Sequence, residues 1–241
     1  MVIPHMLFQT KLYLFGIIKP GSVEPALVWK KSLMKIHTLG LSTLVTTMLW
    51  ANPSFAHHVM GGDVPVTFLH GFLSGLGHPV IGLDHLAFVV PVGLIACLHQ
   101  NAYFSPFTFL AGTLGGIALQ LRLVEMHMVE FAIAGSVVLL GALVIRAKHL
   151  RVSTTISIFV VAGILHGYAY GESIVGAELA PLAAYLMGLL TIQYAIAVLV
   201  ITFMGLIAKA NNSDIPVRIM GGVVLGIGLA FMAENITNAA L

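Results

Sequence analysis

The sequence predicts an all-α integral membrane protein built as a bundle of six transmembrane helices. Of the 241 residues, 59% are hydrophobic and only 8% are charged, whereas soluble domains carry about 25% charged residues. The apolar residues fall into runs close to the ~20 residues that a helix needs to cross a bilayer. Helices are expected because they pair all of their backbone groups internally, which lipid requires.

The first 56 residues of the chain do not share this pattern. Residues 1–33 are mixed in character, and we interpret them as a non-native or disordered extension. Residues 34–56 have a positive start, a short apolar core and small residues before Ala56, which is typical of a cleaved secretory signal peptide. The alternative is an uncleaved N-terminal helix. We expect residues 57–241 to form the membrane domain.

The membrane domain is expected to begin with a short helix and to continue with six spans. Thr67 to Leu76 has apolar residues at helical spacing and is predicted to lie along the membrane surface. The fifth span is long enough to tilt or to extend past the interface. The six spans are predicted at 82–99, 104–121, 127–145, 153–171, 180–208 and 217–234.

The charges in the loops predict the orientation of these spans. With the mature N-terminus on the periplasmic side, Arg122 is the one basic loop residue outside. This asymmetry follows the positive-inside rule and favours a multi-pass protein of the bacterial cytoplasmic (inner) membrane. The basic residues that then face the cytoplasm are Arg146, Lys148, Arg151, Lys209 and Arg218.

The composition also limits the partners of the protein. A formal net charge of +2 gives no reason to expect a nucleic acid. The expected partners are the lipid bilayer and, from the ligand residues described below, a divalent metal ion. The single cysteine, Cys97, excludes an internal disulfide and a cysteine-based zinc site. Eleven histidines favour a role with metals or protons. Glycines recur at helix-contact spacing in the second and last spans, and the sequence leaves homo-oligomerisation open.

The strongest chemical signal is the stretch from His78 to His85, at the start of the first predicted span. Pro79 and Gly82 allow the chain to bend here. His78, Asp84 and His85 could then face one cation, and imidazole and carboxylate are suitable ligands for nickel, cobalt and zinc. The alternative for Asp84 is that it only caps its helix, since Asp is a preferred N-cap residue.

Other residues could extend this site. His166 and Glu172 lie at the outer end of the fourth predicted span, and Glu130 begins the third on the same side. The alternative roles of His166 and Glu172 are a hydrogen-bonded interface histidine and a solvated loop acid. If the signal peptide is cleaved after Ala56, the new amine and His57-His58 could form a nitrogen chelate, which favours nickel or copper. The predicted metal ligands are therefore His57, His58, His78, Asp84, His85, Glu130, His166 and Glu172.

These motifs resemble the HupE/UreJ family of small permeases linked to nickel and cobalt uptake. The family signature His-Pro-x-x-Gly-x-Asp-His is matched by residues 78–85, and its His-Gly-x-Ala-His-Gly-x-Glu region resembles residues 166–172. Glu130 and Ser136 match a third region, and the resemblance covers about residues 57 to 235. Tyr170 stands where the family has a second histidine, and the span around Gln193 lacks the histidine expected there.

The resemblance and the ligand types together predict a secondary transporter that imports Ni2+ or Co2+ and needs no organic cofactor. The chain has no nucleotide-binding loop of the G-x-x-x-x-G-K-[ST] type, so we do not expect it to hydrolyse ATP. An intramembrane metal-dependent enzyme is an alternative, but His-Glu-x-x-His and Gly-x-Ser-x-Gly are both absent, and we expect no enzyme. A b-type haem protein and a non-transporting metal-binding membrane subunit are further alternatives.

Overall fold

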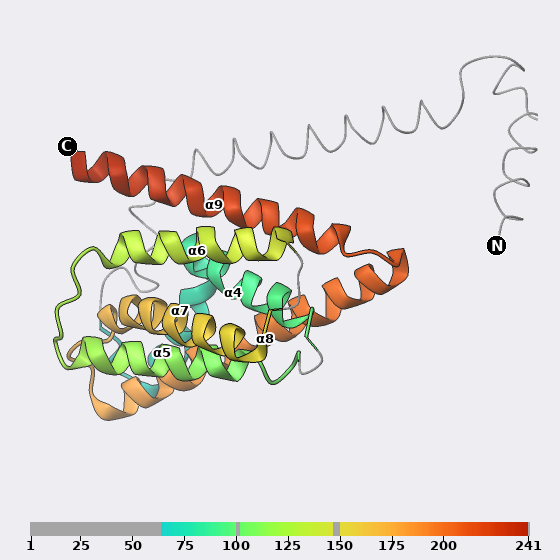
Figure 1. Cartoon of the computed structure of the whole chain (residues 1–241). Coiled ribbons are helices and arrows are strands. Elements are labelled where there is room, and N and C mark those ends of the chain that lie inside the picture. The colour runs from blue at the N-terminus through green and yellow to red at the C-terminus, as the bar shows by residue number, and fades with distance from the viewer. Residues whose placement is uncertain (1–63, 100–101, 147–149, 241) are drawn as a thin grey trace, which may run out of the picture. The chain divides into compact units, whose positions relative to one another are not determined.

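The computed structural model describes residues 64–99, 102–146 and 150–240, without the side chain of Asp84. The predicted extension, the signal peptide, His57 and His58 lie outside these ranges. Every regular element within them is a helix, in agreement with the predicted fold class (Figure 1). The helices are α3 (Phe68–Ile81), α4 (Leu83–Ala96), α5 (Pro106–Leu121), α6 (Val129–Arg146), α7 (Val152–Glu172), α8 (Leu179–Asn211) and α9 (Ile215–Ala240).

Four of these helices, α6 to α9, are long and apolar enough to cross a membrane. Their bounds lie close to those of the last four predicted spans, although α9 ends six residues beyond the predicted end of its span. Helix α5 has 16 residues, which is short of the ~20 that a perpendicular crossing needs. Helices α3 and α4 have 14 residues each and could count as one broken span. The described helices therefore support four or five crossings, and the count of six stays a prediction.

The chain breaks at Gly82, where the sequence predicted a bend. Helices α3 and α4 are inclined by 77° to each other, and Gly82 between them has an extended backbone with φ −75° and ψ 106°. The predicted first span at 82–99 is thus only the second half of a broken helix. The predicted surface helix is longer than expected, because it continues through Pro79 to Ile81.

Glycines allow three pairs of helices to approach each other backbone to backbone. A Cβ atom added to Gly75 of α3 would overlap the backbone of α8, and one added to Gly167 of α7 would overlap Thr113 of α5. Gly141 of α6 packs in the same way on α9. Figure 1 shows α5 beside α7 and α6 beside α9. The contact of Gly75 places α3 along α8. The sequence predicted instead that this helix lies along the membrane surface.

The core of the bundle surrounds α4. Phe88, Val92 and Leu94 of this helix are fully buried, and they pack in one apolar cluster with residues from α5, α6, α7 and α9. Helix α4 contacts α3, α5, α6, α8 and α9. Because α4 is enclosed in this way, His85 in its first turn lies inside the bundle rather than at a lipid-facing surface.

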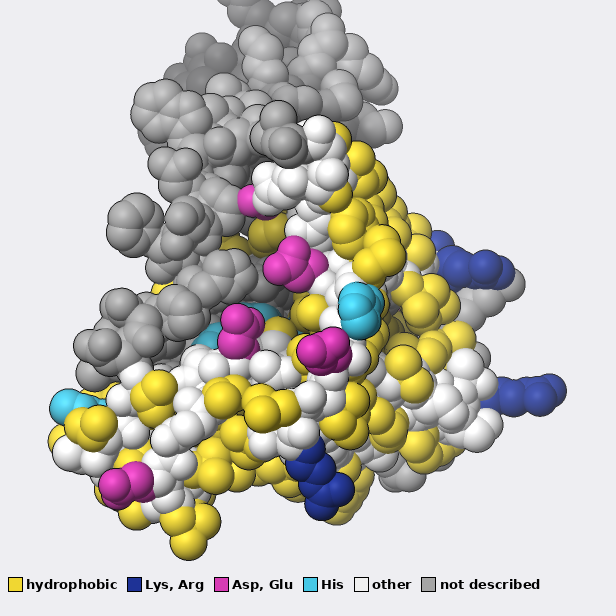
Figure 2. All heavy atoms as spheres, turned by 90° about the vertical axis from the view of Figure 1, so that its left-hand side faces the viewer, with side chains coloured by type: hydrophobic (Ala, Val, Ile, Leu, Met, Phe, Trp, Pro, Cys, Tyr) yellow, Lys and Arg dark blue, Asp and Glu magenta, His cyan; other side chains and the backbone are white. Residues whose placement is uncertain are grey.

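The two ends of the bundle differ in charge. We call one the acidic end: it holds the connections 122–128 and 173–178, and Glu125, Glu130, Glu172 and Glu178 lie there. Figure 2 looks onto this end and shows acidic side chains gathered with a histidine among them. The opposite, basic end holds the last residue of α6, the first residues of α7 and the connection 212–214. Arg146, Arg151, Lys209 and Arg218 lie there. The positive-inside rule predicts that the basic end faces the cytoplasm.

Close glycine packing leads to a prediction for Gly167. We expect Gly167→Ala to lower the free energy of unfolding by about 1–3 kcal/mol, because its Cβ would overlap the Thr113 backbone. Gly226→Ala is the matched control, since no atom lies within 4 Å of a Cβ there, and it should gain up to about 1 kcal/mol in helix propensity. Unfolding in detergent measures both variants, and equal stability of the two would contradict the packing.

Candidate metal centre

Three predicted histidines from three different helices meet inside the bundle. His78 of α3 and His85 of α4 are each 4% exposed, and His166 of α7 is fully buried. The ring centroids of His78 and His85 are 5.1 Å apart, and those of His85 and His166 are 6.1 Å apart. The bend at Gly82 brings the first two together, and the close packing of α7 in the bundle supplies the third.

Two tyrosines complete the wall of this cluster. The ring of Tyr170, from α7, lies 4.4 Å from His85 and 5.2 Å from His78 between centroids. Tyr185, from α8, places its hydroxyl 2.9 Å from Nδ1 of His78. Both tyrosines are fully buried. Tyr170, which stands where the family pattern has a histidine, therefore lies against two of the histidines.

The hydroxyl of Tyr185 links the proton position on His78 to the backbone of α7, because it lies within hydrogen-bond distance of both. The Tyr185 hydroxyl is 3.0 Å from the backbone oxygen of Tyr170, and a carbonyl oxygen can only accept. If the single hydroxyl proton is used there, the hydroxyl oxygen accepts from Nδ1–H of His78. The lone pair of a neutral His78 ring is then on Nε2. Metal-binding histidines are commonly held in this way by a hydrogen bond to the other ring nitrogen.

The cluster lies below the acidic end of the bundle. His166 is six residues before the last residue of α7, and Tyr185 is six residues after the first residue of α8. At 1.5 Å per residue, both are about 9 Å from the helix ends. Burying an imidazole cluster at this depth in a membrane costs free energy, because the polar groups lose their water there. Such groups are therefore usually functional.

Two of the other predicted ligands, Glu130 and Glu172, are not part of this cluster. Glu130 and Glu172 are exposed at the acidic end. Asp84 lies in the first turn of α4, one residue before His85, but its side chain is outside the description. Among the residues that the structure does describe, no group of three His, Cys, Asp or Glu side chains is arranged to hold a metal ion. The histidine rings pack against one another as an aromatic cluster.

Two buried polar residues of α8 were not selected from the sequence. In the sequence, Tyr185 is one aromatic residue within a long apolar run. Only the tertiary structure shows that its hydroxyl contacts His78. Gln193 is fully buried, and neither atom of its amide group has a hydrogen-bond partner. A polar residue in the middle of a long apolar run is the signal that could have identified Gln193.

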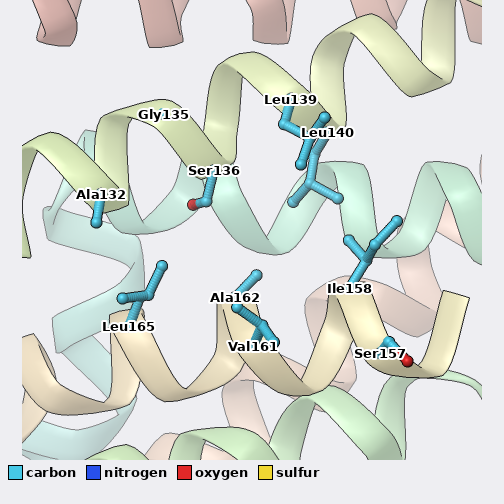
Figure 3. A pocket seen from close by; sticks show the side chains of 10 residues that line it. All are labelled: Ala132, Gly135, Ser136, Leu139, Leu140, Ser157, Ile158, Val161, Ala162 and Leu165. Carbon is cyan, nitrogen blue, oxygen red and sulfur yellow. The ribbon is translucent and has the colours of Figure 1, made fainter. Parts of the chain in front are cut away.

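An apolar groove between α6 and α7 is a separate feature (Figure 3). Its volume is about 360 Å3, and its lining is almost entirely hydrocarbon. Such a lining suits lipid or another apolar group and offers no set of cation ligands. Ser136 and Ser157 are the polar side chains among its lining residues.

Comparison with known proteins supports the resemblance seen in the motifs. The family model described as HupE / UreJ protein matches residues 45–231. Protein HupE of Rhizobium leguminosarum bv. viciae is 32% identical over 199 residues, which cover 79% of this chain and 97% of the relative. No solved structure matches the chain.

The unpaired amide of Gln193 leads to a stability prediction. We expect Gln193→Leu to raise the free energy of unfolding by about 1–3 kcal/mol, because it removes a buried polar group without a partner. Thr191→Val on the same helix is the control, since Thr191 is exposed, and it should change stability by less than about 0.5 kcal/mol. A lower unfolding temperature for Gln193→Leu than for wild type would show that the amide is satisfied in the membrane.

Proposed function

Because the chain belongs to the HupE / UreJ family, we propose that it is a secondary transporter that imports Ni2+ or Co2+ across the cytoplasmic membrane. The observation that carries this proposal is the meeting of His78, His85 and His166 inside the bundle, each at most 4% exposed. These imidazoles come from α3, α4 and α7. A small change in the packing of the three helices would therefore change the distances between the ligands.

The chemistry of these side chains suits the proposed cargo. A divalent ion without its water shell has a prohibitive energy in hydrocarbon, so a transporter must replace the lost water with its own ligands. Imidazole nitrogen binds nickel and cobalt well, whereas magnesium and calcium prefer oxygen. The carboxylate of Asp84, next to His85 in the chain, would add the charge that three neutral imidazoles lack.

The charge distribution supports an entry route from the acidic end. If the basic end faces the cytoplasm, the acidic end faces the periplasm and attracts cations from solution. In this route His57, His58, Glu130 and Glu172 meet the ion before it reaches the buried histidines. The role of Glu130 and Glu172 is then to attract the ion, because both side chains are exposed.

Transport in purified proteoliposomes separates this proposal from a non-transporting metal-binding subunit. An intramembrane hydrolase would also bind metal, but it would not accumulate Ni2+ or Co2+ inside sealed vesicles. The two ions should be compared side by side, because the imidazole ligands accept both.

The first prediction of this proposal concerns His78. We expect His78→Ala to reduce the initial rate of Ni2+ and Co2+ uptake by about tenfold or more, since it removes one ligand of the buried cluster. His70→Ala is the matched control on the same helix, because His70 is exposed. Asp84→Asn, which keeps the volume and removes the charge, should also impair uptake. Wild-type rates in His78→Ala proteoliposomes would refute the proposed route.

A second prediction concerns the acidic end. The double variant Glu130→Gln, Glu172→Gln should raise the KM for Ni2+ uptake a few-fold at low salt, because exposed carboxylates attract the ion through solvent. The difference from wild type should shrink at about 0.5 M salt, where the Debye length is only a few ångströms. Asp214→Asn at the basic end is the control. A defect that is equally large at high salt would indicate direct coordination by these acids.

A further inference from the structure

The environment of His166 differs at its two ring nitrogens. Nε2 lies 3.1 Å from the hydroxyl oxygen of Ser136 on α6. Nδ1 is buried and has no hydrogen-bond partner in the structure as described. The ring stacks on Phe88, with centroids 3.5 Å apart and planes inclined by 20°. Phe88 and Ser136 thus hold the ring on one face and at one edge.

A second hydrogen bond of Ser136 sets the direction of the first. The Ser136 hydroxyl is 2.7 Å from the backbone oxygen of Ile133, which is the shorter of its two contacts. The carbonyl of Ile133 can only accept, so the single hydroxyl proton points there. Ser136 therefore accepts its other hydrogen bond, and the donor is Nε2–H of His166.

We propose that Ser136 is a positioning residue that holds neutral His166 with its proton on Nε2, so that the lone pair of Nδ1 is available to the transported cation. This inference rests on the proposed function, and it adds which atom of His166 binds the ion. A neutral imidazole has one N–H and one lone pair, and the hydrogen bond at one nitrogen selects which nitrogen is left to coordinate metal.

The assignment explains two otherwise separate observations. A buried imidazole nitrogen without a hydrogen-bond partner costs free energy. A role as cation ligand explains why Nδ1 of His166 has no partner within the protein. A polar Ser136 in the wall of an otherwise apolar groove is explained by its contact with His166 (Figure 3). If Ser136 were lost, the ring proton could move to Nδ1 and block coordination there.

The groove provides a matched control for this proposal. Ser157 lines the same groove from α7 and is exposed (Figure 3). Ser136→Ala removes the acceptor of the His166 proton, Ser136→Thr keeps a hydroxyl at the same place, and Ser157→Ala removes a hydroxyl from the other wall. All three substitutions are small, so they test the hydrogen bond with little change in packing.

The experiment uses the purified full chain in lipid nanodiscs, labelled with 15N-histidine. Its readouts are Ni2+ affinity and the 15N chemical shifts of His166 in the metal-free protein, identified by their loss in His166→Gln. We expect wild type, Ser136→Thr and Ser157→Ala to show a protonated Nε2 and similar affinity. Ser136→Ala should bind Ni2+ about 10–100-fold more weakly and should show a mixture of the two tautomers.

Two results would overturn the assignment. One is a wild-type His166 with its proton on Nδ1, and the other is a Ser136→Ala protein with wild-type affinity and an unchanged tautomer. In either case, Ni2+ uptake by wild-type proteoliposomes would leave the proposed function intact. If wild type neither binds nor imports Ni2+ or Co2+, the proposed function itself fails, and the role of Ser136 toward a cation fails with it.

Discussion

The break between α3 and α4 is the constraint on which the candidate centre depends. His78 and His85 are seven residues apart in the sequence. In a continuous helix they would be separated by about 10 Å along the helix axis. The extended backbone at Gly82 and the 77° bend bring their ring centroids to 5.1 Å. A helix break inside a bundle also frees backbone groups, and a membrane protein tolerates this only where other protein groups enclose it.

Close glycine contacts hold the halves of the broken helix in place. Helix α3 packs on α8 through Gly75, and Gly93 of α4 meets α8 further along its length. The 33-residue α8 thus supports both sides of the break. Because these contacts involve backbone atoms, they leave little freedom for sliding, and Tyr185 of α8 is held within hydrogen-bond distance of His78. The packing of the helices and the geometry of the imidazoles are therefore linked.

The polar groups of the bundle are arranged by depth. Charged side chains are concentrated at the two ends, with mainly acids at one and bases at the other. The histidines lie further inside, where His78 is hydrogen-bonded to Tyr185 and His166 to Ser136. This order suits a cation that is first attracted by exposed carboxylates in water and then bound by imidazoles where water is scarce.

The sequence by itself determined the membrane class, the bounds of α6 to α9 to within about six residues, and the approach of His78 to His85 across a bend. These features are local, because apolar runs and short motifs are read directly along the chain. The tertiary structure alone decided that α3 packs on α8, that Ser136 meets His166, and that Glu172 stays outside the cluster. Such contacts depend on how each helix is rotated about its axis, and the glycines and side chains of distant segments set that rotation.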